Sequence, residues 1–308
     1  VADGPGLGQR QFRTAYGESA GGGQCIPAEL EFSFKHVRAE SDIIEACRGI
    51  DFLFVPAAFP PITAAVLDNI PSIRMIQSAG TGYDKVDTAS AARCNIPVAN
   101  SPGANITTVA EFTIAMMITL QRRMAIADRE IKAGKYNLIR EKLFSGGMQE
   151  ISDLHLGLVG FGAIGRKVAQ VAGFLGARVS YFDVIRPDPT IEEQLQVIYK
   201  DFNDLLRTSD AVSIHTPLTK QTYHLIGRKE LRLMAPGSIL INTARGEIVA
   251  PDALADALED EHLAGAAVDT LYPEPPTPDH PLLNLSKAAR DRLLITPHIA
   301  GTTKSAFQ

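Results

Sequence analysis

Short apolar runs recur along the second half of the chain, and most of them are separated by stretches with the spacing of a helix. A run of about four to eight apolar residues is typical of a strand buried on both faces. Strands that alternate with helices predict an α/β fold with a doubly wound parallel sheet. Six strands are predicted in this half, at residues 154–161, 178–182, 211–215, 238–242, 265–268 and 293–295.

The first third of the chain shows the same rhythm less clearly. The first thirty residues are rich in glycine and predict at most one strand, around residues 12–16. From residue 31 onward the alternation of strand and helix begins, which predicts a second α/β unit. Its predicted strands are 51–55, 73–77 and 96–100, and residues 62–67 suit a helix.

A long helix is predicted at residues 107–122, capped by Thr107 or Thr108. Because it is apolar on most faces, we expect it to be buried against a second domain or a second subunit. The cluster Ser101-Pro102-Gly103 lies just before it and would break either a strand or a helix. A chain of 308 residues suits two domains, and this cluster predicts the boundary between them.

Composition excludes several classes of protein. With 45% hydrophobic residues and a net charge of −5, the chain has no electrostatic footprint for nucleic acid or an anionic membrane. The apolar stretch 112–120 is too short to span a bilayer, and no signal-peptide pattern opens the chain. Three cysteines without a CxxC pair predict reduced thiols, no metal site and a cytoplasmic location.

A glycine-rich turn follows the first strand of the second half. Gly160 permits a tight turn, Gly162 lets the backbone approach a pyrophosphate, and Gly165 allows close packing of helix on strand. Residues 166–175 are predicted to form the helix, whose first N–H groups would bind the phosphates. A lone GxGxxG motif is weak evidence, so the neighbouring elements decide its meaning.

The next strand supports the binding of a dinucleotide. It ends at Asp183, 18 residues after Gly165, where a carboxylate can accept both ribose hydroxyls. A carboxylate there repels a 2′-phosphate and favours NAD over NADP, although the nearby Arg186 keeps NADP open. Strand, glycine motif, helix, strand and acid in this order favour NAD over a packing turn without a ligand.

Motifs beyond the glycine turn carry a resemblance to a known family. They occur in family order between residues 71 and 301, and comprise Ala79-Gly-Thr-Gly-Tyr-Asp84, Asn100-Ser-Pro-Gly103, Val109-Ala-Glu111, His215-Thr-Pro-Leu218, Asn242-Thr-Ala-Arg-Gly246, Asp269 with Glu274-Pro275, and Pro297-His298-Ile-Ala-Gly301. The chain resembles the D-isomer-specific 2-hydroxyacid dehydrogenases. Its first sixty residues match that pattern only loosely.

The resemblance implies an architecture and a set of site residues. Two Rossmann-like domains are implied: a flavodoxin-like substrate (catalytic) domain of residues 1–100, completed by 299–308, and an NAD-binding domain of residues 101–298 inserted into it. Family members usually continue past the position of Gln308 with a helix that returns to the substrate domain. A homodimer is also implied, with the region of the Thr107 helix at its interface. The implied catalytic residues are Arg245, Glu274 and His298. The implied cofactor contacts are Gly160, Gly162, Ala163, Ile164, Gly165, Asp183, Thr216, Pro217, Thr243, Ala244, Arg245, Asp269, His298 and Gly301. The implied substrate contacts are the backbone of Ala79 and Gly80 together with Arg245 and His298.

The chemistry of the three catalytic candidates can be judged separately. Arg245 follows a strand, and its planar fork suits a carboxylate, although most arginines form surface ion pairs. His298 also follows a strand and titrates in the range needed to give and take a proton. His215 is its nearest rival among the seven histidines, but its position suits a cofactor loop. Glu274 would favour the charged imidazole and fix its tautomer, and only the family pattern distinguishes it from an exposed loop acid.

The sequence therefore predicts an NAD-dependent enzyme that interconverts a small 2-keto acid and a D-2-hydroxy acid. One alternative is a non-catalytic, NAD-sensing protein like the corepressors that share the fold. Another is a dehydrogenase of phosphite or formate from the same family. The loop 78–82 is either a plain turn or a backbone cradle for an anion. It contains no lysine before Lys85, which argues against phosphite.

Overall fold

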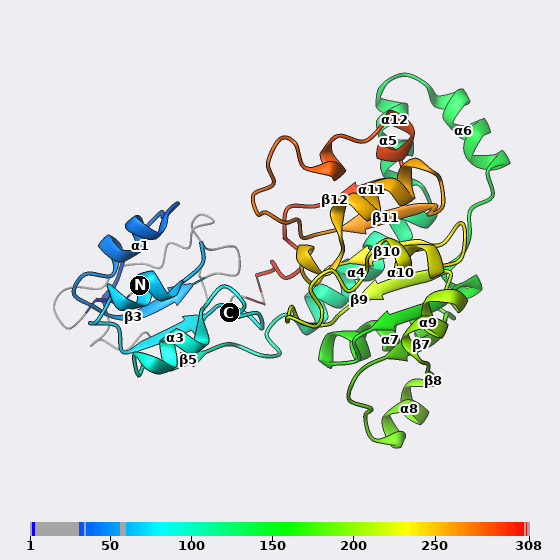
Figure 1. Ribbon diagram of the computed structural model, residues 1–308. Helices are drawn as coiled ribbons and strands as arrows, with labels where there is room; N and C mark the ends of the chain where they lie inside the picture. Colours follow the sequence, from blue (N-terminus) through cyan, green and yellow to red (C-terminus); the bar gives the residue numbers. More distant parts are fainter. Residues whose placement is uncertain (1, 4–30, 34, 56–59, 305, 307–308) are drawn as a thin grey trace. The chain divides into compact units, whose positions relative to one another are not determined.

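The chain divides into two compact units. The computed structural model describes residues 2–3, 31–33, 35–55, 60–304 and 306. One unit comprises Val1–Asn105 with Thr302–Gln308, and the other comprises Ile106–Gly301. Both are drawn in Figure 1.

The smaller unit contains a five-stranded sheet in the order β2-β1-β3-β4-β5. The strands are β1 Ala2–Asp3, β2 Glu31–Phe32, β3 Ile50–Val55, β4 Met75–Ser78 and β5 Val98–Ala99. The last three are parallel and correspond to the predicted runs. Strand β1 pairs antiparallel with both β2 and β3, which the sequence did not predict. The strand predicted at residues 12–16 lies outside the described residues.

Three short helices cover this sheet: α1 Glu40–Ala46, α2 Ala64–Asp68 and α3 Thr88–Arg93. Helix α2 begins two residues later than predicted because the Thr63 hydroxyl accepts a hydrogen bond from the Val66 N–H, which caps the helix. Asp87 caps α3 in the same way through the Ser90 N–H, at 2.9 Å. The buried side chains of strands and helices together form one apolar core, which includes Ile43, Leu53, Val66, Leu67 and Ile76.

The larger unit is built on a seven-stranded sheet in which all strands are parallel. Its strands are β6 His155–Val159, β7 Arg178–Phe182, β8 Val197–Tyr199, β9 Ala211–Ile214, β10 Ile239–Asn242, β11 Gly265–Val268 and β12 Leu293–Ile295. All six predicted strands are present. The sequence missed β8, a three-residue edge strand too short to give a periodic signal.

The strand order places a topological switch point in the middle of this sheet. It runs β12-β11-β10-β9-β6-β7-β8, so the chain builds outward from β6 in one direction and from β9 in the other. At such a point the connections leave in opposite directions and open a crevice at the carboxyl ends of the strands, where α/β folds bind ligands. The prediction of an α/β protein with Rossmann-like parallel sheets is confirmed.

Helices cover both faces of the larger sheet. They are α4 Ile106–Gln121, α5 Met124–Lys132, α6 Tyr136–Ser145, α7 Ala163–Phe174, α8 Pro189–Leu195, α9 Phe202–Thr208, α10 Arg228–Leu233, α11 Pro251–Glu259 and α12 Lys287–Arg290, with short 3₁₀ turns at Ile151–Asp153, Gly246–Ile248 and Pro281–Leu283. Side chains of α4 and α7 share one apolar core with the sheet, and those of α9 to α12 share a second. Strands β9, β10 and β11 are accordingly buried at every position.

Helix α4 is the apolar helix that the sequence predicted. Its buried residues Ile114, Met116 and Met117 pack within the larger unit rather than against a second domain or subunit. The expectation of such an external partner was therefore wrong for this side of the helix. The apolar character of α4 comes from its contacts with α7 and with strands β10 and β11 of the sheet.

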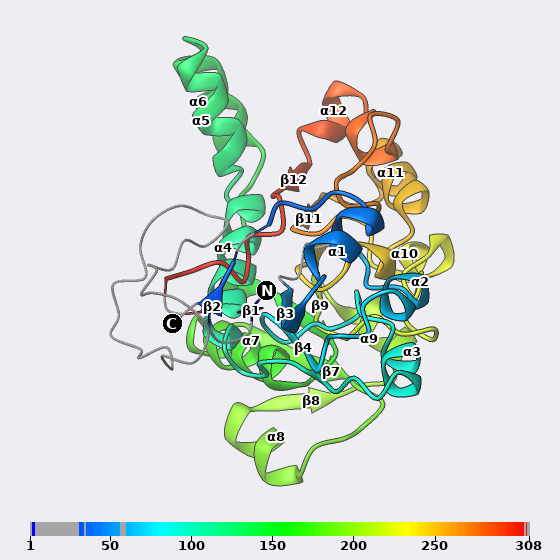
Figure 2. The same ribbon diagram turned by 90° about the vertical axis from the view of Figure 1, so that its left-hand side faces the viewer.

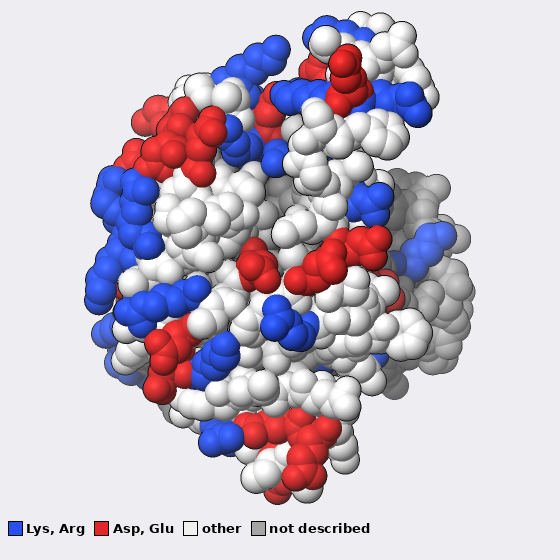
Figure 3. All heavy atoms as spheres, turned by 90° about the vertical axis from the view of Figure 1, so that its right-hand side faces the viewer, with Lys and Arg blue, Asp and Glu red and all other residues white. Residues whose placement is uncertain are grey.

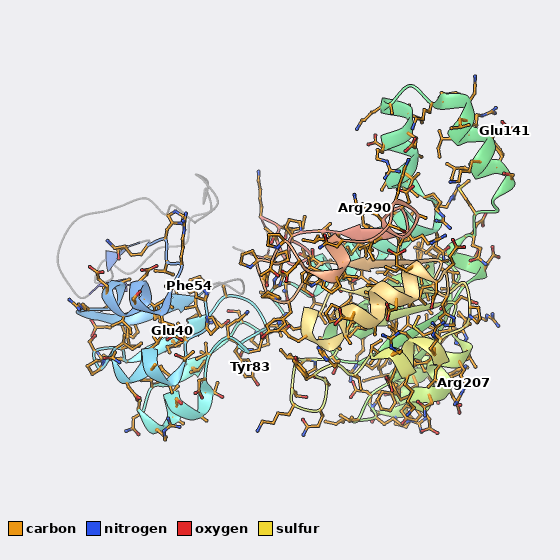
Figure 4. All side chains as sticks on the ribbon, turned by 45° about the horizontal axis from the view of Figure 1, so that its top comes forward. Glu40, Phe54, Tyr83, Glu141, Arg207 and Arg290 are labelled. Carbon is orange, nitrogen blue, oxygen red and sulfur yellow. The ribbon has the colours of Figure 1, made fainter. Side chains whose placement is uncertain are left out.

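Helices α5 and α6 form an arm that projects from the larger unit (Figures 1 and 2). No residue of α5 is buried, and Ile139 is the buried residue of α6. Figure 4 shows Glu141 on α6, the outer helix of the arm. An ion pair at 2.8 Å between Arg129 of α5 and Asp291, the residue that ends α12, ties the base of the arm to the sheet unit.

The described residues contain no candidate membrane span, and the face drawn in Figure 3 carries charges of both signs. Among the described residues, no helix combines the length and the apolar character needed to cross a bilayer. Figure 3 shows Lys and Arg side chains interspersed with Asp and Glu over one face. This mixed surface agrees with the net charge of −5 and gives no extended basic footprint there.

Gly157 in β6 tests how tightly α9 packs on the sheet. A Cβ added there would lie 3.0 Å from both Leu205 Cγ and Ser209 Cβ, which are buried. We expect Gly157→Ala to lower the free energy of unfolding by about 1–3 kcal/mol through overpacking. Gly173→Ala, on the exposed side of α7 with nothing within 4 Å, should raise it by about 0.5–1 kcal/mol. Urea unfolding followed by circular dichroism measures both, and equal effects would contradict the close packing.

Candidate active site

The glycine turn after β6 has the tight turn predicted at Gly160 and the close packing predicted at Gly165, and it is open at Gly162. Gly160 has a φ of +99°, and a Cβ there would lie 2.6 Å from the His215 carbonyl carbon and 2.7 Å from the Thr216 nitrogen. A Cβ at Gly165 would collide with the Gly160 carbonyl, so α7 packs closely on the turn. A Cβ at Gly162 would meet nothing within 4 Å. The open side of the turn is therefore at Gly162, where a pyrophosphate is expected to approach.

Helix α7 begins directly on this turn. Gly162 is its N-cap residue and no side chain caps the helix end. Of the first two helical residues, Ala163 is exposed and Ile164 is half-buried. An uncapped first turn presents N–H groups and the positive end of the helix dipole, an arrangement that suits a phosphate.

Asp183 lies at the end of β7 and holds the glycine turn. Its Oδ2 accepts the Phe161 N–H at 2.6 Å, and its Oδ1 accepts the Ile185 N–H at 3.0 Å. Each carboxylate oxygen can accept a further hydrogen bond, so these contacts are compatible with ribose hydroxyls. The structure thus adds a role that the sequence did not reveal, since Asp183 also orders the loop that would hold the phosphates.

The turn after β9 faces the glycine turn across the switch point. The His215 N–H donates to the Val159 carbonyl at 2.7 Å, and the His215 Nε2 lies 2.9 Å from the Ser213 hydroxyl. Burial lowers the pKa of His215 to about 4, so its ring is neutral near neutral pH. A ring that stays neutral suits a structural position better than acid–base catalysis. Thr216 and Pro217 continue this turn, half-buried and exposed respectively.

The turn after β10 carries Arg245 and is organised by a buried asparagine. The Asn242 side chain donates to the Arg245 carbonyl at 2.8 Å and accepts the Ala244 N–H at 3.0 Å. Arg245 itself is half-buried, and its Nη1 donates to the Ala244 carbonyl at 2.7 Å. Sequence reasoning placed Asn242 in a motif but assigned it no role. A polar residue that ends an otherwise apolar strand was the available signal.

Thr243, expected to contact the cofactor, is almost fully buried. Its hydroxyl lies 3.0 Å from the Thr113 hydroxyl of α4, which in turn donates to the Val109 carbonyl at 2.8 Å. This side-chain contact fixes the Arg245 turn to α4. Because the Thr243 side chain is engaged with α4, the predicted contact of Thr243 with the cofactor would have to come from its backbone. That contact remains a prediction.

The Arg245 turn and the Glu274 loop approach each other closely. A Cβ at Gly246 would lie 2.5 Å from the Leu271 carbonyl carbon and 2.8 Å from the Tyr272 nitrogen. Glycine is thus required where the two backbones touch. This contact brings the residues after β10 next to the loop that follows β11.

Glu274 and His298 form a direct pair. The His298 Nδ1 lies 2.9 Å from one carboxylate oxygen of Glu274 and 3.1 Å from the other. Both side chains are largely buried, with 17% and 22% of their surfaces exposed. A carboxylate on Nδ1 keeps a proton on that nitrogen, which leaves Nε2 as the position from which a proton is exchanged with a ligand.

Asp269 lies beneath the His298 turn and fixes its backbone. Its carboxylate accepts the Thr296 hydroxyl at 2.5 Å, the Ile299 N–H at 3.0 Å and the Ala300 N–H at 2.8 Å. The residue is 1% exposed, and its buried carboxyl group is satisfied by these three hydrogen bonds. His298, which lies between Thr296 and Ile299 in the sequence, adopts the left-handed backbone conformation with a φ of +55°. The implied cofactor contacts of Asp269 and of Gly301, which follows this turn, remain predictions.

The two residues expected to hold the substrate carboxylate lie in the smaller unit, after β4. The Ala79 N–H donates to the Val55 carbonyl at 2.8 Å and continues the parallel ladder. Because the Ala79 N–H is already bonded within the sheet, Gly80 is the residue of the two that is left for the predicted backbone cradle. Gly80 has a φ of +87°. Around Gly80, the Ser101 N–H donates to the Gly80 carbonyl, and the side-chain amide of Asn100 donates to the Thr81 carbonyl.

The larger unit brings most predicted residues to one edge. The glycine turn, Asp183, Thr216, Arg245, Asp269 and His298 follow the carboxyl ends of β6, β7, β9, β10, β11 and β12. The described residues hold no group of three or more His, Cys, Asp or Glu side chains with the arrangement of a metal site. The chemistry these residues offer is an anion-binding turn, a guanidinium and an imidazole with its carboxylate.

The glycine turn separates folding from binding in a testable way. Gly160→Ala should lower the free energy of unfolding by at least about 1–2 kcal/mol, because it strains the left-handed backbone and clashes with the His215 turn. Gly162→Ala should leave stability nearly unchanged and weaken NADH binding by about tenfold, since its methyl group enters the open side of the turn. Thermal unfolding and NADH fluorescence titration measure the two effects. Undiminished NADH binding by Gly162→Ala would contradict the placement of the phosphates.

Comparisons with known proteins agree with this arrangement. A family model described as the NAD binding domain of D-isomer specific 2-hydroxyacid dehydrogenases matches residues 114–300. The chain is 38% identical over 261 residues to the glyoxylate reductase of Korarchaeum cryptofilum, which covers 85% of this chain and 76% of that protein. It is 33% identical over 280 residues to the hydroxypyruvate reductase of Thermotoga maritima, which covers 90% and 86%.

Solved structures give the same result. The D-lactate dehydrogenase of Aquifex aeolicus, complexed with NAD and lactic acid, superposes with a TM-score of 0.76 at 28% identity, covering 86% of this chain and 80% of that one. An NAD-dependent formate dehydrogenase of Staphylococcus aureus in complex with NAD superposes with a TM-score of 0.76 at 32% identity, covering 86% and 77%. The family match spans more than half of the chain and includes the turns that carry Arg245, Glu274 and His298. The chain therefore belongs to the D-isomer specific 2-hydroxyacid dehydrogenase family.

Proposed function

We propose that this chain reduces a small 2-keto acid to the D-2-hydroxy acid, and catalyses the reverse reaction, with NAD as its cofactor. The observation that carries the proposal is the pair formed by His298 and both carboxylate oxygens of Glu274, at 2.9 and 3.1 Å. This pair belongs to the same sheet edge as Arg245 and the glycine turn. A proton donor, a guanidinium and a dinucleotide turn are the parts that reduction of a 2-keto acid requires.

The residues present fit NAD. The open side at Gly162 and the uncapped start of α7 suit the pyrophosphate, and Asp183 suits the ribose hydroxyls. When bound, NAD supplies or takes up the hydride. The Asp183 carboxylate would repel a 2′-phosphate, which supports NAD over NADP.

The side chains of the larger unit divide the remaining chemistry. The Arg245 guanidinium binds the substrate carboxylate and polarises the adjacent carbonyl, for which its planar fork is suited. His298 donates a proton from Nε2 to the developing alkoxide oxygen during reduction and accepts it during oxidation. Glu274 accepts a hydrogen bond from Nδ1, which fixes the orientation and tautomer of the ring and leaves Nε2 for the exchange of the proton.

The names of two relatives support particular 2-keto acids as substrates. The similar proteins named above reduce glyoxylate and hydroxypyruvate according to their names. We propose these two acids as substrates.

Formate is the second candidate, because formate dehydrogenases are among the similar structures. Oxidation of formate to carbon dioxide removes a hydride and moves no proton, so it needs no acid–base pair. The buried Glu274–His298 pair therefore favours the 2-keto acid. The same pair does not decide against a non-catalytic NAD sensor, but the similar proteins named above are enzymes, which favours catalysis.

A homodimer is part of the proposal, and the arm of α5 and α6 supports it. Its exposed apolar side chains include Tyr136, Leu138 and Phe144, of which 58%, 67% and 72% of the surface is exposed. Apolar side chains gathered on a projecting element are typical of an interaction surface. A second copy of the chain would cover these side chains. The contact does not need the apolar side chains of α4, because the larger unit already buries them.

We also propose a cytoplasmic location and small molecules as the other ligands. Cys47 and Cys94 are free thiols, and burial raises the pKa of Cys47 to about 11, which makes it unreactive. The interspersed charges of Figure 3 give no support for binding nucleic acid.

His298→Ala tests the assigned roles. We expect the turnover number for glyoxylate with NADH to fall by about 10²–10⁴-fold, because the proton donor is lost, while NADH binding is retained. His36→Ala, at an exposed position of the smaller unit, is the control and should leave turnover unchanged. Turnover is followed by NADH absorbance. Unchanged turnover in His298→Ala would rule out the proton donor, and oxidation of formate without reduction of glyoxylate would overturn the substrate class.

The arm makes the oligomeric state testable. Replacing both Leu138 and Phe144 by Glu should convert a dimer to a monomer, because two charges would have to be buried at the contact. Phe174→Glu, at the 90% exposed end of α7, is the matched control and should leave the dimer intact. Light scattering coupled to gel filtration measures the mass. A dimer that survives the double substitution places the interface elsewhere.

A further inference from the structure

The loop that follows Asp183 contains an arginine that is held by a glutamate. The Arg186 Nε lies 2.8 Å from one carboxylate oxygen of Glu192 on α8, and its Nη2 lies 2.9 Å from the other. This is the bidentate geometry in which a guanidinium and a carboxylate interact most strongly. The guanidinium carbon also lies 5.0 Å from the centre of the Tyr199 ring, a cation–π contact. Two contacts therefore fix the direction of an otherwise mobile side chain.

Glu192 is itself held in place. Only 15% of its side chain is exposed, against 60% for Arg186. The Tyr181 hydroxyl, from buried β7, donates to the same carboxylate. The Arg186 guanidinium and the Tyr181 hydroxyl together lower the pKa of Glu192 to about 2, so the carboxylate is charged at every pH at which the protein would be assayed. An isolated surface ion pair contributes little, but a bidentate pair with a third, buried partner is better fixed.

The same network reaches the cofactor turn. The Tyr181 ring stacks on the Phe161 ring with centroids 3.9 Å apart, and the Phe161 N–H donates to Asp183. Arg186 is three residues from Asp183, so their Cα atoms are at most about 11 Å apart. A long side chain at this position can reach a group bound at Asp183. In this structure it is directed to Glu192 instead.

Dinucleotide folds distinguish NADP from NAD at this point. A carboxylate at the end of the second strand accepts the 2′-hydroxyl of NAD, whereas a nearby arginine binds the 2′-phosphate of NADP. This chain has both residues, so the sequence alone left NADP open. What Arg186 does depends on which anion it pairs with, the 2′-phosphate or Glu192.

We propose that Glu192 is a specificity-determining residue that holds Arg186 away from the ribose 2′ position and so selects against NADP. The inference rests on the proposed function, in which Asp183 receives the adenosine ribose. Two effects then act against the 2′-phosphate. Asp183 repels it directly, and Glu192 removes the cation that would offset this repulsion. Glu192 is a positioning residue, since it acts through Arg186.

Direct binding of NADH and NADPH to the full chain tests this proposal. Glu192→Gln keeps the shape of the side chain but removes its charge and most of its hold on Arg186. We expect it to tighten NADPH binding by about tenfold, as a new charge-assisted contact would, and to leave NADH binding nearly unchanged. Fluorescence titration measures both dissociation constants, and 2′,5′-ADP compared with 5′-AMP isolates the phosphate from the nicotinamide end. Retained NADH binding also shows that the variant is folded.

Two controls separate release of Arg186 from a simple change of charge. Glu193→Gln removes the same charge from the next, exposed position of α8 and should leave the ratio of NADPH to NADH affinity unchanged. The double variant Arg186→Gln with Glu192→Gln should lose the gain that Glu192→Gln alone produces. In the wild-type chain, Arg186→Gln should not weaken NADPH binding, because Arg186 is already engaged.

The outcomes are distinguishable. A gain in NADPH affinity that needs both the loss of Glu192 and the presence of Arg186 supports the proposal. An unchanged ratio in Glu192→Gln, or a gain that persists without Arg186, overturns it while leaving the proposed function intact. Failure of the wild-type chain to bind either NADH or 5′-AMP would instead overturn the proposed function, and this inference with it.

Discussion

Strands β9, β10 and β11 of the larger unit are buried at every position, and this constraint decides where its chemistry can lie. A strand covered by helices on both faces does not accommodate charged side chains along its length. Charged groups are therefore found after the strands end. The glycine turn, Asp183, Arg245, Asp269 and His298 all follow carboxyl ends of parallel strands. Since these ends share one edge of the sheet, residues far apart in the sequence become neighbours.

The turns at this edge depend on contacts between backbones and on buried polar anchors. Gly160 and Gly246 lie where one turn touches the next, and a Cβ at either position would collide with a neighbouring backbone. Asn242 and Asp269 are each 1% exposed and use their side chains to hold the turns that present Arg245 and His298. A buried polar group without partners would be costly, so each anchor requires its turn to keep one shape. Site geometry and fold stability are thus maintained by the same hydrogen bonds.

Sequence patterns identified the elements with a strong local signal. The runs at 178–182, 265–268 and 293–295 coincide with β7, β11 and β12, and α4 begins and ends within one residue of its predicted bounds. Strand β8 was missed, because three residues at a sheet edge give no periodicity. The antiparallel pairing of β1 was also missed, because a two-residue strand gives no sequence pattern from which its direction could be predicted. The apolar surface of α4 was recognised but its partner was not, since a hydrophobic pattern shows that a face is buried and not what covers it.

The sequence by itself determined the α/β class, the dinucleotide turn at Gly160 to Gly165 and the acid at Asp183, because each depends on residue types at short, fixed spacing. It also supplied, through the family pattern, the three residues Arg245, Glu274 and His298. Only the tertiary structure decided that Glu274 faces His298 Nδ1, that Asp269 holds the His298 turn from below and that Arg186 pairs with Glu192. These contacts join residues of different loops, or a loop residue and a helix residue. Their geometry depends on the order of strands in the sheet and on side-chain packing, neither of which local spacing encodes.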